Sequence, residues 1–387
     1  MTGASTRRRL AWGGVTAAMA VLALVACSSA PEGKKGPEPA RPKKAELLAA
    51  LPDYCNTPDG MALFPDNSFL ISMPNFNDET VPPLIMKITA DNKAEKFCEF
   101  PTPYPGLDKG VDRIGPMGMA RAPSGDVYLA DMQYMKDKNQ KSRMWKIVIK
   151  DGKFDKLVLV AKGLNVANGI AIRGDYVYIT ESVLAESSDP KPKEGEKQPE
   201  LFKDPLVSAV MRFKLDEENV TLKTPLTDDP HVIATFKSYK TAWGFGADGI
   251  AFDSKGNLFI GLFGDGKMFK LEFDKDGKVV SNKLFAEAPG KLINCDGMSC
   301  DTRTDKLYVA DSAANAIQVI APDGTITTLA QNEDVTDKTT GMLDQPCEAL
   351  LRGDTIVSSN MDWPFPKFRN TKHQQPATLS VIKLNGK

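Results

Sequence analysis

Five side chains with oxygen donors stand at equivalent places in a repeated sequence pattern. Each directly precedes a glycine or alanine, and an apolar segment follows. The five are Asp59, Asn168, Asp248, Asp296 and Glu348. Carboxylates gathered in one place repel, by roughly 3 kcal/mol for a pair about 5 Å apart at an effective dielectric of about 20. A bound cation would relieve that repulsion, and all-oxygen ligands favour Ca²⁺, with Mg²⁺ or another divalent ion as alternatives.

A second explanation of the pattern is turn formation, because Asp-Gly and Asn-Gly are common in tight turns. A turn requires neither Asn168 nor Glu348, and glutamate is a poor turn residue. We therefore favour a metal site, with Asp248 and Asp296 as candidate catalytic bases. The second copy of the pattern has Met117 at the equivalent place, and a thioether does not bind a hard cation.

The pattern occurs six times, at intervals of about 50 residues with one longer exception, and this is the length of a propeller blade. Several intervals contain a second hairpin signal, Asp-Gly between alternating apolar runs, at Asp151-Gly152, Asp276-Gly277 and Asp323-Gly324. Two hairpins per unit predict an all-β fold, a six-bladed β-propeller with four antiparallel strands per blade. The alternative, a pair of β-sandwiches, does not explain six similar units.

Closure of the ring is expected to involve both ends of the domain. The last apolar run, Ala377–Leu384, would form the third strand of the sixth blade. Residues near Ala45–Leu51 either supply the outermost strand of that blade or form a short helix.

The first strand of each propeller blade lines the central channel, so the five oxygen-bearing side chains are expected at one mouth of it. Long loops between second and third strands should return to this mouth, and they are Pro74–Pro83, Asp131–Ser142, Glu181–Ser208 and Asn360–Gln375. Such loops on a rigid scaffold usually carry function. Glu181–Ser208 would account for the long interval, either as a lid or as a solvated insertion. Three acids that end second strands, Asp131, Glu181 and Asp311, are expected either to cap loops or to support the ligands from behind, rather than to bind the metal themselves.

The N-terminal segment predicts export and lipid attachment. Arg7–Arg9 is basic, Leu10–Ala26 is apolar, and Leu24–Cys27 resembles the cleavage box of bacterial lipoproteins. We expect a signal peptide over 1–26, a lipidated Cys27 with a flexible tether over 27–43, and the propeller over 44–387. Ser28 favours the outer membrane of the bacterial cell envelope, facing the periplasm. The alternatives are a secretory signal with a chance cysteine and an uncleaved anchor.

Composition excludes some partners. The net charge of −1 leaves no basic footprint for nucleic acid, and we expect a monomer. No CxxC pair is present, which argues against a zinc site. Cys295 and Cys347 hold equivalent places in the repeat, so they are either neighbours or buried free thiols.

Three stretches carry a resemblance to a known family: Asn168–Glu181, Asp248–Ile260 and Asp296–Asp311. From about Asp53 onward the chain resembles the calcium-dependent gluconolactonase/regucalcin (senescence marker protein) family of six-bladed propellers. The resemblance implies a calcium ion held by Asp59, Asn168 and Asp248, with Asp248 also acting as general base or acid in lactone hydrolysis. The family's Arg-x-Asn-Asp segment for sugars is missing, and Arg121–Ser124 stands roughly in its place.

Two functions follow as hypotheses. The first is a calcium-dependent hydrolase of a lactone or ester, with Asp248 or Asp296 taking a proton from water. The second is a non-catalytic propeller, tethered to the envelope, whose structural metal supports the binding of a ligand or protein partner. Relatives that depend on histidine are disfavoured, because only His231 and His373 are present and both lie outside the repeated motifs.

Overall fold

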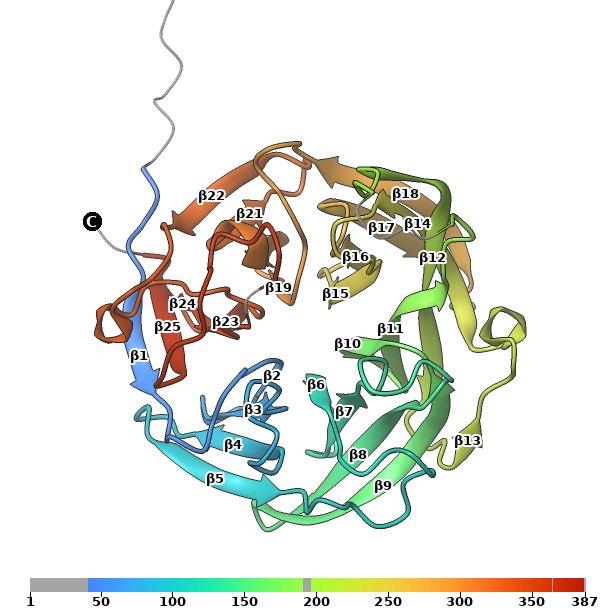
Figure 1. Ribbon diagram of the computed structural model, residues 1–387, viewed down its shortest axis with the longest axis horizontal. Coiled ribbons are helices and arrows are strands. Elements are labelled where there is room, and N and C mark those ends of the chain that lie inside the picture. The colour runs from blue at the N-terminus through green and yellow to red at the C-terminus, as the bar shows by residue number, and fades with distance from the viewer. Residues whose placement is uncertain (1–40, 191–195, 364, 386–387) are drawn as a thin grey trace, which may run out of the picture. The chain divides into compact units, whose positions relative to one another are not determined.

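The computed structural model describes residues 41–190, 196–363 and 365–385. Its compact unit begins at Pro42 and forms six antiparallel sheets around a central channel, as the sequence predicts (Figure 1). The signal peptide, Cys27 and most of the tether lie outside the described residues. Within the described part, no helix has the length and apolar character needed to cross a membrane.

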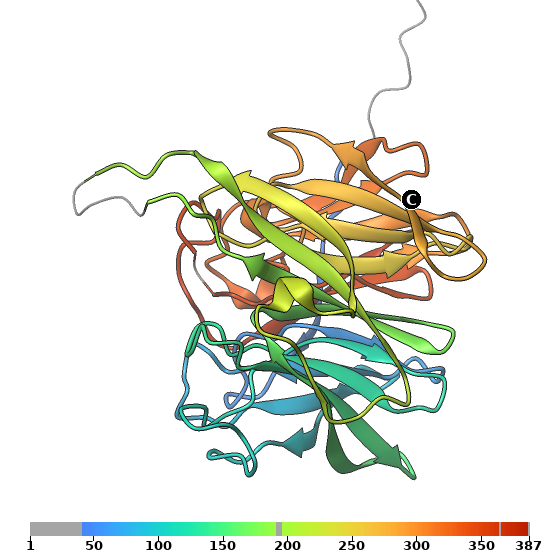
Figure 2. The ribbon, with the colours of Figure 1, turned by 90° about the vertical axis from the view of Figure 1, so that its right-hand side faces the viewer.

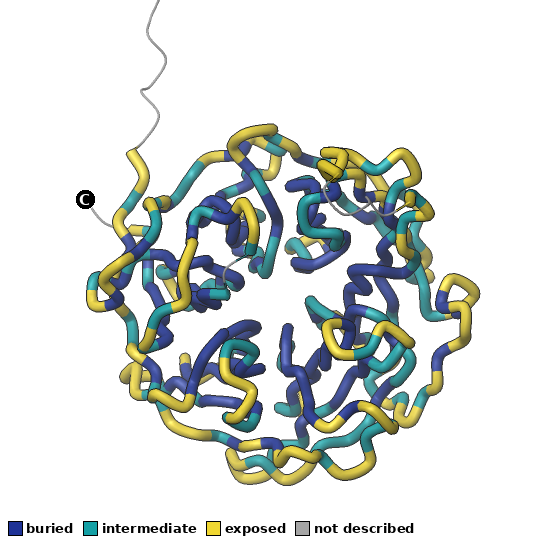
Figure 3. The backbone as a smooth tube through the Cα atoms, in the orientation of Figure 1, coloured by how far each residue is buried: buried dark blue, intermediate teal, exposed yellow. Residues whose placement is uncertain are grey.

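Each blade has its innermost strand at the channel and its outermost strand at the rim. The strands, given for each blade from the channel outward, are β2 (Met61–Leu63), β3 (Phe69–Met73), β4 (Leu84–Ile88) and β5 (Ala94–Glu99); β6 (Pro116–Arg121), β7 (Val127–Asp131), β8 (Ser142–Lys150) and β9 (Lys153–Leu164); β10 (Ala167–Arg173), β11 (Tyr176–Ala185), β12 (Leu201–Lys214) and β14 (Val232–Lys240); β15 (Ala247–Phe252), β16 (Leu258–Leu262), β17 (Lys267–Phe273) and β18 (Val279–Glu287); β19 (Met298–Asp301), β20 (Lys306–Asp311), β21 (Ala316–Ile320) and β22 (Ile326–Gln331); and β23 (Leu350–Arg352), β24 (Thr355–Ser359), β25 (Thr378–Lys383) and β1 (Glu46–Ala50). Short 3₁₀ helices occur at η1 (Leu226–Asp228), η2 (Ser312–Ala314) and η3 (Lys338–Thr340). Burial is greatest toward the channel, and the exposed residues gather at the rim and in the loops (Figure 3).

The N-terminal strand closes the ring. β1 pairs antiparallel with β25, from Glu46 opposite Val381 to Ala50 opposite Thr378. The expectation of a strand near Ala45–Leu51 is therefore confirmed, and the helix is excluded. Because the two ends of the domain share one sheet, separating them would open the whole ring.

The repeated glycines allow the blades to approach one another closely. A Cβ atom on Gly249 would lie 2.1 Å from the carbonyl oxygen of Asp296 in the next blade, and one on Gly169 would lie 2.3 Å from that of Asp248. Gly60, Gly118 and Gly297 make similar approaches, and none of these five glycines adopts a left-handed φ. Contact between blades, and not turn geometry, therefore requires glycine at these places.

We expect Gly249→Ala to destabilise the protein by about 3 kcal/mol, because the new methyl group meets backbone that cannot move without shifting a blade. Urea unfolding followed by circular dichroism measures the change. The control is Gly174→Ala, where φ is +57° but no atom lies near the new Cβ, so about 1–2 kcal/mol of backbone strain is expected. Equal losses in the two variants would contradict the packing role of Gly249.

Acids at the ends of second strands cap the loops that lead into the inner strands. Glu181 accepts hydrogen bonds from the backbone N–H groups of Asn165 and Val166, and Asp311 accepts from those of Ile293 and Asn294. Asp131 similarly accepts from Gly115 N–H. The predicted capping role of Asp131, Glu181 and Asp311 is confirmed. Asp265 does the same for Tyr239 and Lys240, and the sequence analysis missed it.

The long interval in the repeat has two causes, of which the sequence analysis found one. The β11–β12 hairpin projects from the disc (Figure 2), and residues 191–195 near its tip lie outside the described part, so the choice between lid and solvated insertion stays a prediction. The second cause is the connection between β12 and β14. It runs to the preceding blade, where β13 (Val220–Thr221) pairs in parallel with β9.

Candidate functional site

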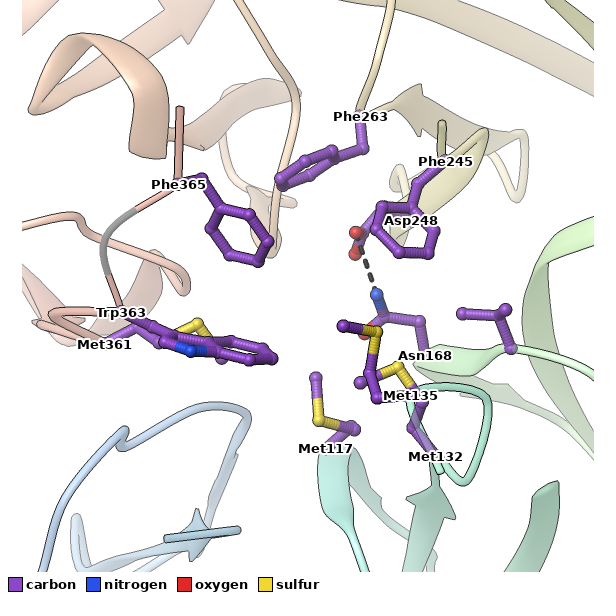
Figure 4. A pocket seen from close by; sticks show the side chains of 11 residues that line it. Met117, Met132, Met135, Asn168, Phe245, Asp248, Phe263, Met361, Trp363 and Phe365 are labelled. Atoms are coloured by element: carbon purple, nitrogen blue, oxygen red, sulfur yellow. Dashed lines mark hydrogen bonds between the residues drawn. The ribbon is translucent and has the colours of Figure 1, made fainter. Parts of the chain in front are cut away.

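The predicted site residues lie at the starts of inner strands around the channel. Asn168 and Asp248 are within β10 and β15, each at a β-bulge that interrupts the strand register, and bulges commonly re-aim side chains. Asn168 Nδ2 donates a hydrogen bond of 2.8 Å to Asp248 Oδ2, and Figure 4 shows the two side chains facing each other. Asp59, Asp296 and Glu348 each precede their inner strand by two residues.

Hydroxyl groups of preceding blades hold the backbone of this ring. Thr180 Oγ1 donates to the carbonyl oxygen of Asp248 at 2.9 Å, and Ser359 Oγ donates to that of Asp59 at 2.8 Å. Ser72 makes the equivalent bond to Met117. These bonds fix the ring positions to second strands, so the side chains at the channel are supported by rigid structure.

The four carboxyl groups of the ring, those of Asp59, Asp248, Asp296 and Glu348, interact electrostatically. Burial raises the pKa of Asp248 well above its usual value, and the charges of Asp296, Asp59 and Glu348 raise it further. Burial, Asp296 and Glu348 also raise the pKa of Asp59. Asp59 is only 5% exposed, and its buried Oδ2 has no hydrogen-bond partner. These acids therefore interact electrostatically, whereas their predicted roles as metal ligands stay a prediction.

Asp296 and Glu348 also accept hydrogen bonds from nearby protein groups. Asp296 accepts hydrogen bonds from Ser312 Oγ and Gly297 N–H, and burial raises its pKa to about 7. Glu348 accepts from Ala349 N–H at 2.9 Å, and burial, followed by Asp296, raises its pKa to about 8.

Glu348 also lies at a different level along the channel from Asn168 and Asp248. It lines a second cavity within a collar formed by the residues that follow the small residue of each repeat. This collar consists of Met61, Met119, Ile170, Ile250, Met298 and Leu350. The acids are therefore bounded by apolar side chains on this side of the channel.

The donor chemistry of the ring fits a hard cation, but the acids are not gathered into a finished cluster. Within the described residues, no three Asp, Glu, His or Cys side chains are arranged to hold a metal ion. In favour of an ion, Asp59 offers an unsatisfied buried oxygen, and every carboxyl in the ring has a raised pKa, which a cation would lower. The calcium site thus stays a prediction.

An apolar cavity forms the mouth of the channel directly above Asn168 and Asp248 (Figure 4). Its volume is about 50 Å³, and it is partly open to solvent. Asn168 and Asp248 are its polar lining residues, and the others are Met117, Met132, Met135, Val166, Phe245, Phe263, Met361, Trp363 and Phe365. Met117, which interrupts the sequence of oxygen donors, is a wall of this cavity.

Aromatic rings form a continuous arc around the mouth. Trp363 lies 5.0 Å from Phe76 and 4.9 Å from Phe365, between ring centroids. The arc continues through further ring contacts, each between 5.3 and 6.3 Å, which join Phe365, Phe368, Phe263, Phe245 and Tyr134. The sequence analysis missed this arc, although the concentration of aromatic residues in the predicted loop Asn360–Gln375 was a signal for it.

The two histidines make their contacts away from the ring of acids, whereas Cys295 and Cys347 directly precede Asp296 and Glu348 in the chain. His231 stacks on Phe213 and contacts Asp229, whereas His373 belongs to a loop network around Asp362. All five cysteines of the described part are free thiols. Cys347 Sγ contacts the Pro58 carbonyl oxygen and Cys295 Sγ that of Lys267, so the free-thiol alternative holds.

The raised pKa values predict how stability depends on pH in the absence of a divalent ion. A folded-state pKa of about 8 for Glu348, against about 4.3 when unfolded, means that the folded state holds an extra proton between these values. Its stabilising contribution is complete below about pH 4 and falls by about 1.4 kcal/mol per pH unit until it is lost near pH 8. In EDTA, stability measured by urea unfolding should therefore fall from pH 5 to pH 8 more steeply in the native chain than in Glu348→Gln. Parallel curves would contradict the assignment, and the exposed Asp66→Asn variant is the control.

Comparisons with known proteins support the fold. No protein-family profile matches the chain, and no curated protein sequence does either. Among solved structures, a gluconolactonase from Xanthomonas campestris has 15% identity and a TM-score of 0.51, with 90% of this chain and 96% of the other covered. Regucalcin from Agrobacterium tumefaciens, described as a calcium-binding protein, has 10% identity and a TM-score of 0.52, with 88% and 94% covered.

A third similar structure has different chemistry. The PQQ-bound aldose sugar dehydrogenase of Streptomyces coelicolor has 16% identity and a TM-score of 0.51, with 89% of this chain and 99% of the other covered. One scaffold thus carries hydrolytic, calcium-binding and redox proteins. Function must therefore be argued from the side chains at the mouth.

Proposed function

We propose that this protein is a metal-dependent hydrolase that opens a lactone or an ester at the mouth of the channel. One observation carries the proposal: a buried carboxyl group, Asp248, lies at the floor of an apolar cavity and is held there by Asn168. A positioned carboxylate that takes the proton of an attacking water contributes typically 10²–10⁴-fold in rate. The similar fold of the Xanthomonas gluconolactonase is compatible with this chemistry.

Each residue has a definite task in this proposal. Asp248 is 4% exposed, so water solvates it poorly and its carboxylate is a stronger base than a surface aspartate. Asn168 binds Oδ2 of Asp248, which leaves Oδ1 for the water. Asp296, the other candidate base, already accepts from Ser312 and Gly297, and we therefore assign the base to Asp248.

A calcium ion would be held by Asp59, Asn168 and Asp248. The negative charges of Asp296 and Glu348 would add to its attraction. When bound, the ion would polarise the carbonyl oxygen of the substrate as a Lewis acid. The support for it is the donor chemistry and the unsatisfied oxygen of Asp59. Location in the bacterial cell envelope, through a lipid on Cys27, and a monomeric state are part of the same proposal, and the Leu24–Cys27 sequence supports the anchor.

Calcium should stabilise the folded protein. At a calcium concentration 100-fold above its dissociation constant, we expect about 2.7 kcal/mol of added stability, seen as a rise in melting temperature over the protein in EDTA at pH 8. Asp59→Asn should lose most of this rise, whereas Asp126→Asn, at an exposed turn, should keep it. An equal rise in both variants would place the ion elsewhere.

Turnover of a panel of lactones and aryl esters, before and after chelation, tests the function itself. The proposal expects hydrolysis that chelation removes and calcium restores. The absence of the sugar segment and the presence of Met117 in the mouth wall favour the second candidate, a tethered propeller that binds a ligand or protein partner without turnover. Calcium and ligand binding with no hydrolysis anywhere in the panel would select that candidate.

A further inference from the structure

Arg113 is a buried cation without a carboxylate partner. It precedes β6 and is 4% exposed. Its Nη1 donates to the Glu79 carbonyl oxygen and its Nη2 to that of Pro74, both at 2.8 Å. Its Nε is buried with no hydrogen-bond partner, and no ion pair to Arg113 occurs among the described residues. Backbone oxygens, that of Val81 included, accept hydrogen bonds from part of the guanidinium's N–H groups, and no carboxylate of the described residues is paired with its charge.

Nearby acids do not neutralise Arg113. Glu79 pairs through its carboxylate with Lys136 at the surface. Glu79, followed by Asp112 and Asp78, favours the charged form of Arg113 only through longer-range charge, without an ion pair. A buried guanidinium is normally paired because its desolvation is costly. An unpaired one beside a cavity is therefore explained by an anion that binds there.

Arg113 lines such a cavity, and this cavity adjoins the mouth. Its volume is about 200 Å³, it is partly open to solvent, and Glu79, Arg113, Gln133 and Lys136 supply its charged and amide groups. Met132, Met135 and Trp363 line both this cavity and the apolar one above Asp248. The two cavities therefore share these side chains as walls, and we call them the polar lobe, at Arg113, and the apolar lobe, at Asp248.

The residues that line the apolar lobe indicate which chemical group of a ligand binds there. Its walls are methionine and aromatic side chains, with Asn168 and Asp248 as its polar lining residues. A polyhydroxylated sugar would leave most of its hydroxyl groups without partners in this lobe. A flat aromatic body would instead pack against Trp363, Phe365 and the polarizable thioethers of Met117 and Met135.

We propose that the ligand of this site is an aromatic lactone or ester that carries a carboxylate. The carboxylate binds the guanidinium of Arg113 in the polar lobe, the aromatic ring system lies against Trp363 in the apolar lobe, and the acyl carbon lies near Asp248. The last element rests on the proposed function, whereas the binding of an aromatic carboxylate does not. In the reaction, the oxygen of water bonds to the acyl carbon and the acyl C–O bond breaks. Asp248 takes the proton of water and returns it to the leaving oxygen.

Two probes of the same shape separate the contributions of charge and aromatic surface. Isothermal titration of the native protein, with calcium present, compares 2-naphthoate with uncharged 2-naphthamide. We expect naphthoate to bind roughly tenfold more tightly, in the range of a charge-assisted hydrogen bond after desolvation. Trp363→Leu should weaken both probes alike. Arg113→Met should reduce the affinity for naphthoate to that for naphthamide and leave naphthamide unchanged.

A matched control is Arg173→Met. Arg173 also donates to a backbone oxygen, that of Gly256, and rests on an aromatic ring, but it does not line either lobe. It should leave both affinities unchanged.

Equal affinities of the two probes for the native protein would overturn the role of Arg113, whatever the variants do. Weakening of both probes by Arg113→Met would mean that Arg113 only anchors the loop of Glu79. If neither probe binds, the assignment of an aromatic ligand fails. These results are independent of turnover: tight naphthoate binding without hydrolysis of any lactone would reject the proposed function and keep the ligand class. Hydrolysis confined to neutral lactones, with equal affinities for the two probes, would reject the carboxylate-bearing ligand and keep the proposed function.

Discussion

Replacement of Asp248 by asparagine should lower kcat for lactone or ester hydrolysis by about 10²–10⁴-fold, the usual contribution of a positioned base. The amide keeps the size of the side chain but cannot accept a proton. It can also still meet Asn168, whose amide can offer its oxygen to the new NH₂ group. Because the carboxyl cluster loses one charge, the variant should be at least as stable as the native protein. Steady-state rates, together with urea unfolding, measure both effects.

The pH dependence gives this experiment a second, independent readout. Burial and the neighbouring acids raise the pKa of Asp248, so activity should fall as the pH drops through that raised value and the base becomes protonated. A bound cation opposes this shift, so the acidic limb should move to lower pH as calcium is added. The control is Asp253→Asn, because Asp253 caps the turn between β15 and β16, away from the mouth. Activity retained in Asp248→Asn would remove the base from Asp248 and with it the proposed mechanism.

The sequence was informative where structure repeats. The small residue before each inner strand is set by close approach between blades, the Asp-Gly pairs by hairpin turns, and the oxygen donors by a shared place at the channel. Each of these constraints recurs in blade after blade, so one sequence shows it several times. The ring of acids and the closure by β1 could be predicted for that reason.

The rest of the site comes from segments that do not repeat. Trp363, Phe365 and Arg113 lie in loops without counterparts in the other blades, so no periodic pattern in the sequence indicates them. Their positions depend on contacts between blades, such as that of Trp363 with Phe76. Met117 is an example, because the repeat shows only that this position has no oxygen donor. The cavity it lines becomes visible only when loops from four blades come together. The same holds for β13, whose pairing with β9 joins two blades through a segment with no counterpart elsewhere.

A buried ion network holds the loop that supplies the aromatic wall. Lys338 Nζ contacts Asp344 and lies 2.7 Å from Asp362 Oδ2, and all three side chains are nearly inaccessible. Asp362 also accepts from Asn370 Nδ2 and from Gln374 N–H, both at 2.7 Å. It stands between Met361 and Trp363, so this network fixes where these two mouth residues lie.

Lys338→Met should therefore destabilise the protein by about 3–5 kcal/mol near neutral pH, since it leaves two buried carboxylates without their cation. Burial and Asp362 raise the pKa of Asp344, which is about 6 even with the lysine present, and loss of the lysine raises it further. Protonation of Asp344 removes one uncompensated charge, so the deficit should shrink as the pH falls from the raised pKa of the variant to about 6, below which Asp344 is protonated in both proteins. Urea unfolding of both proteins at pH 8 and pH 5 measures this difference.

Lys383→Met is the matched control, because Lys383 pairs with Glu46 at the surface with both side chains more than half exposed. Such a pair is worth about 0–1 kcal/mol, and its removal should show little dependence on pH in this range. If Lys338→Met costs no more than this control, the network does not anchor the loop. If the cost is large but the same at both pH values, the uncompensated charge of Asp344 is not its cause. A large, pH-dependent loss should come with weaker binding of aromatic ligands under conditions where the variant is still folded, because the loop that the network releases carries Trp363.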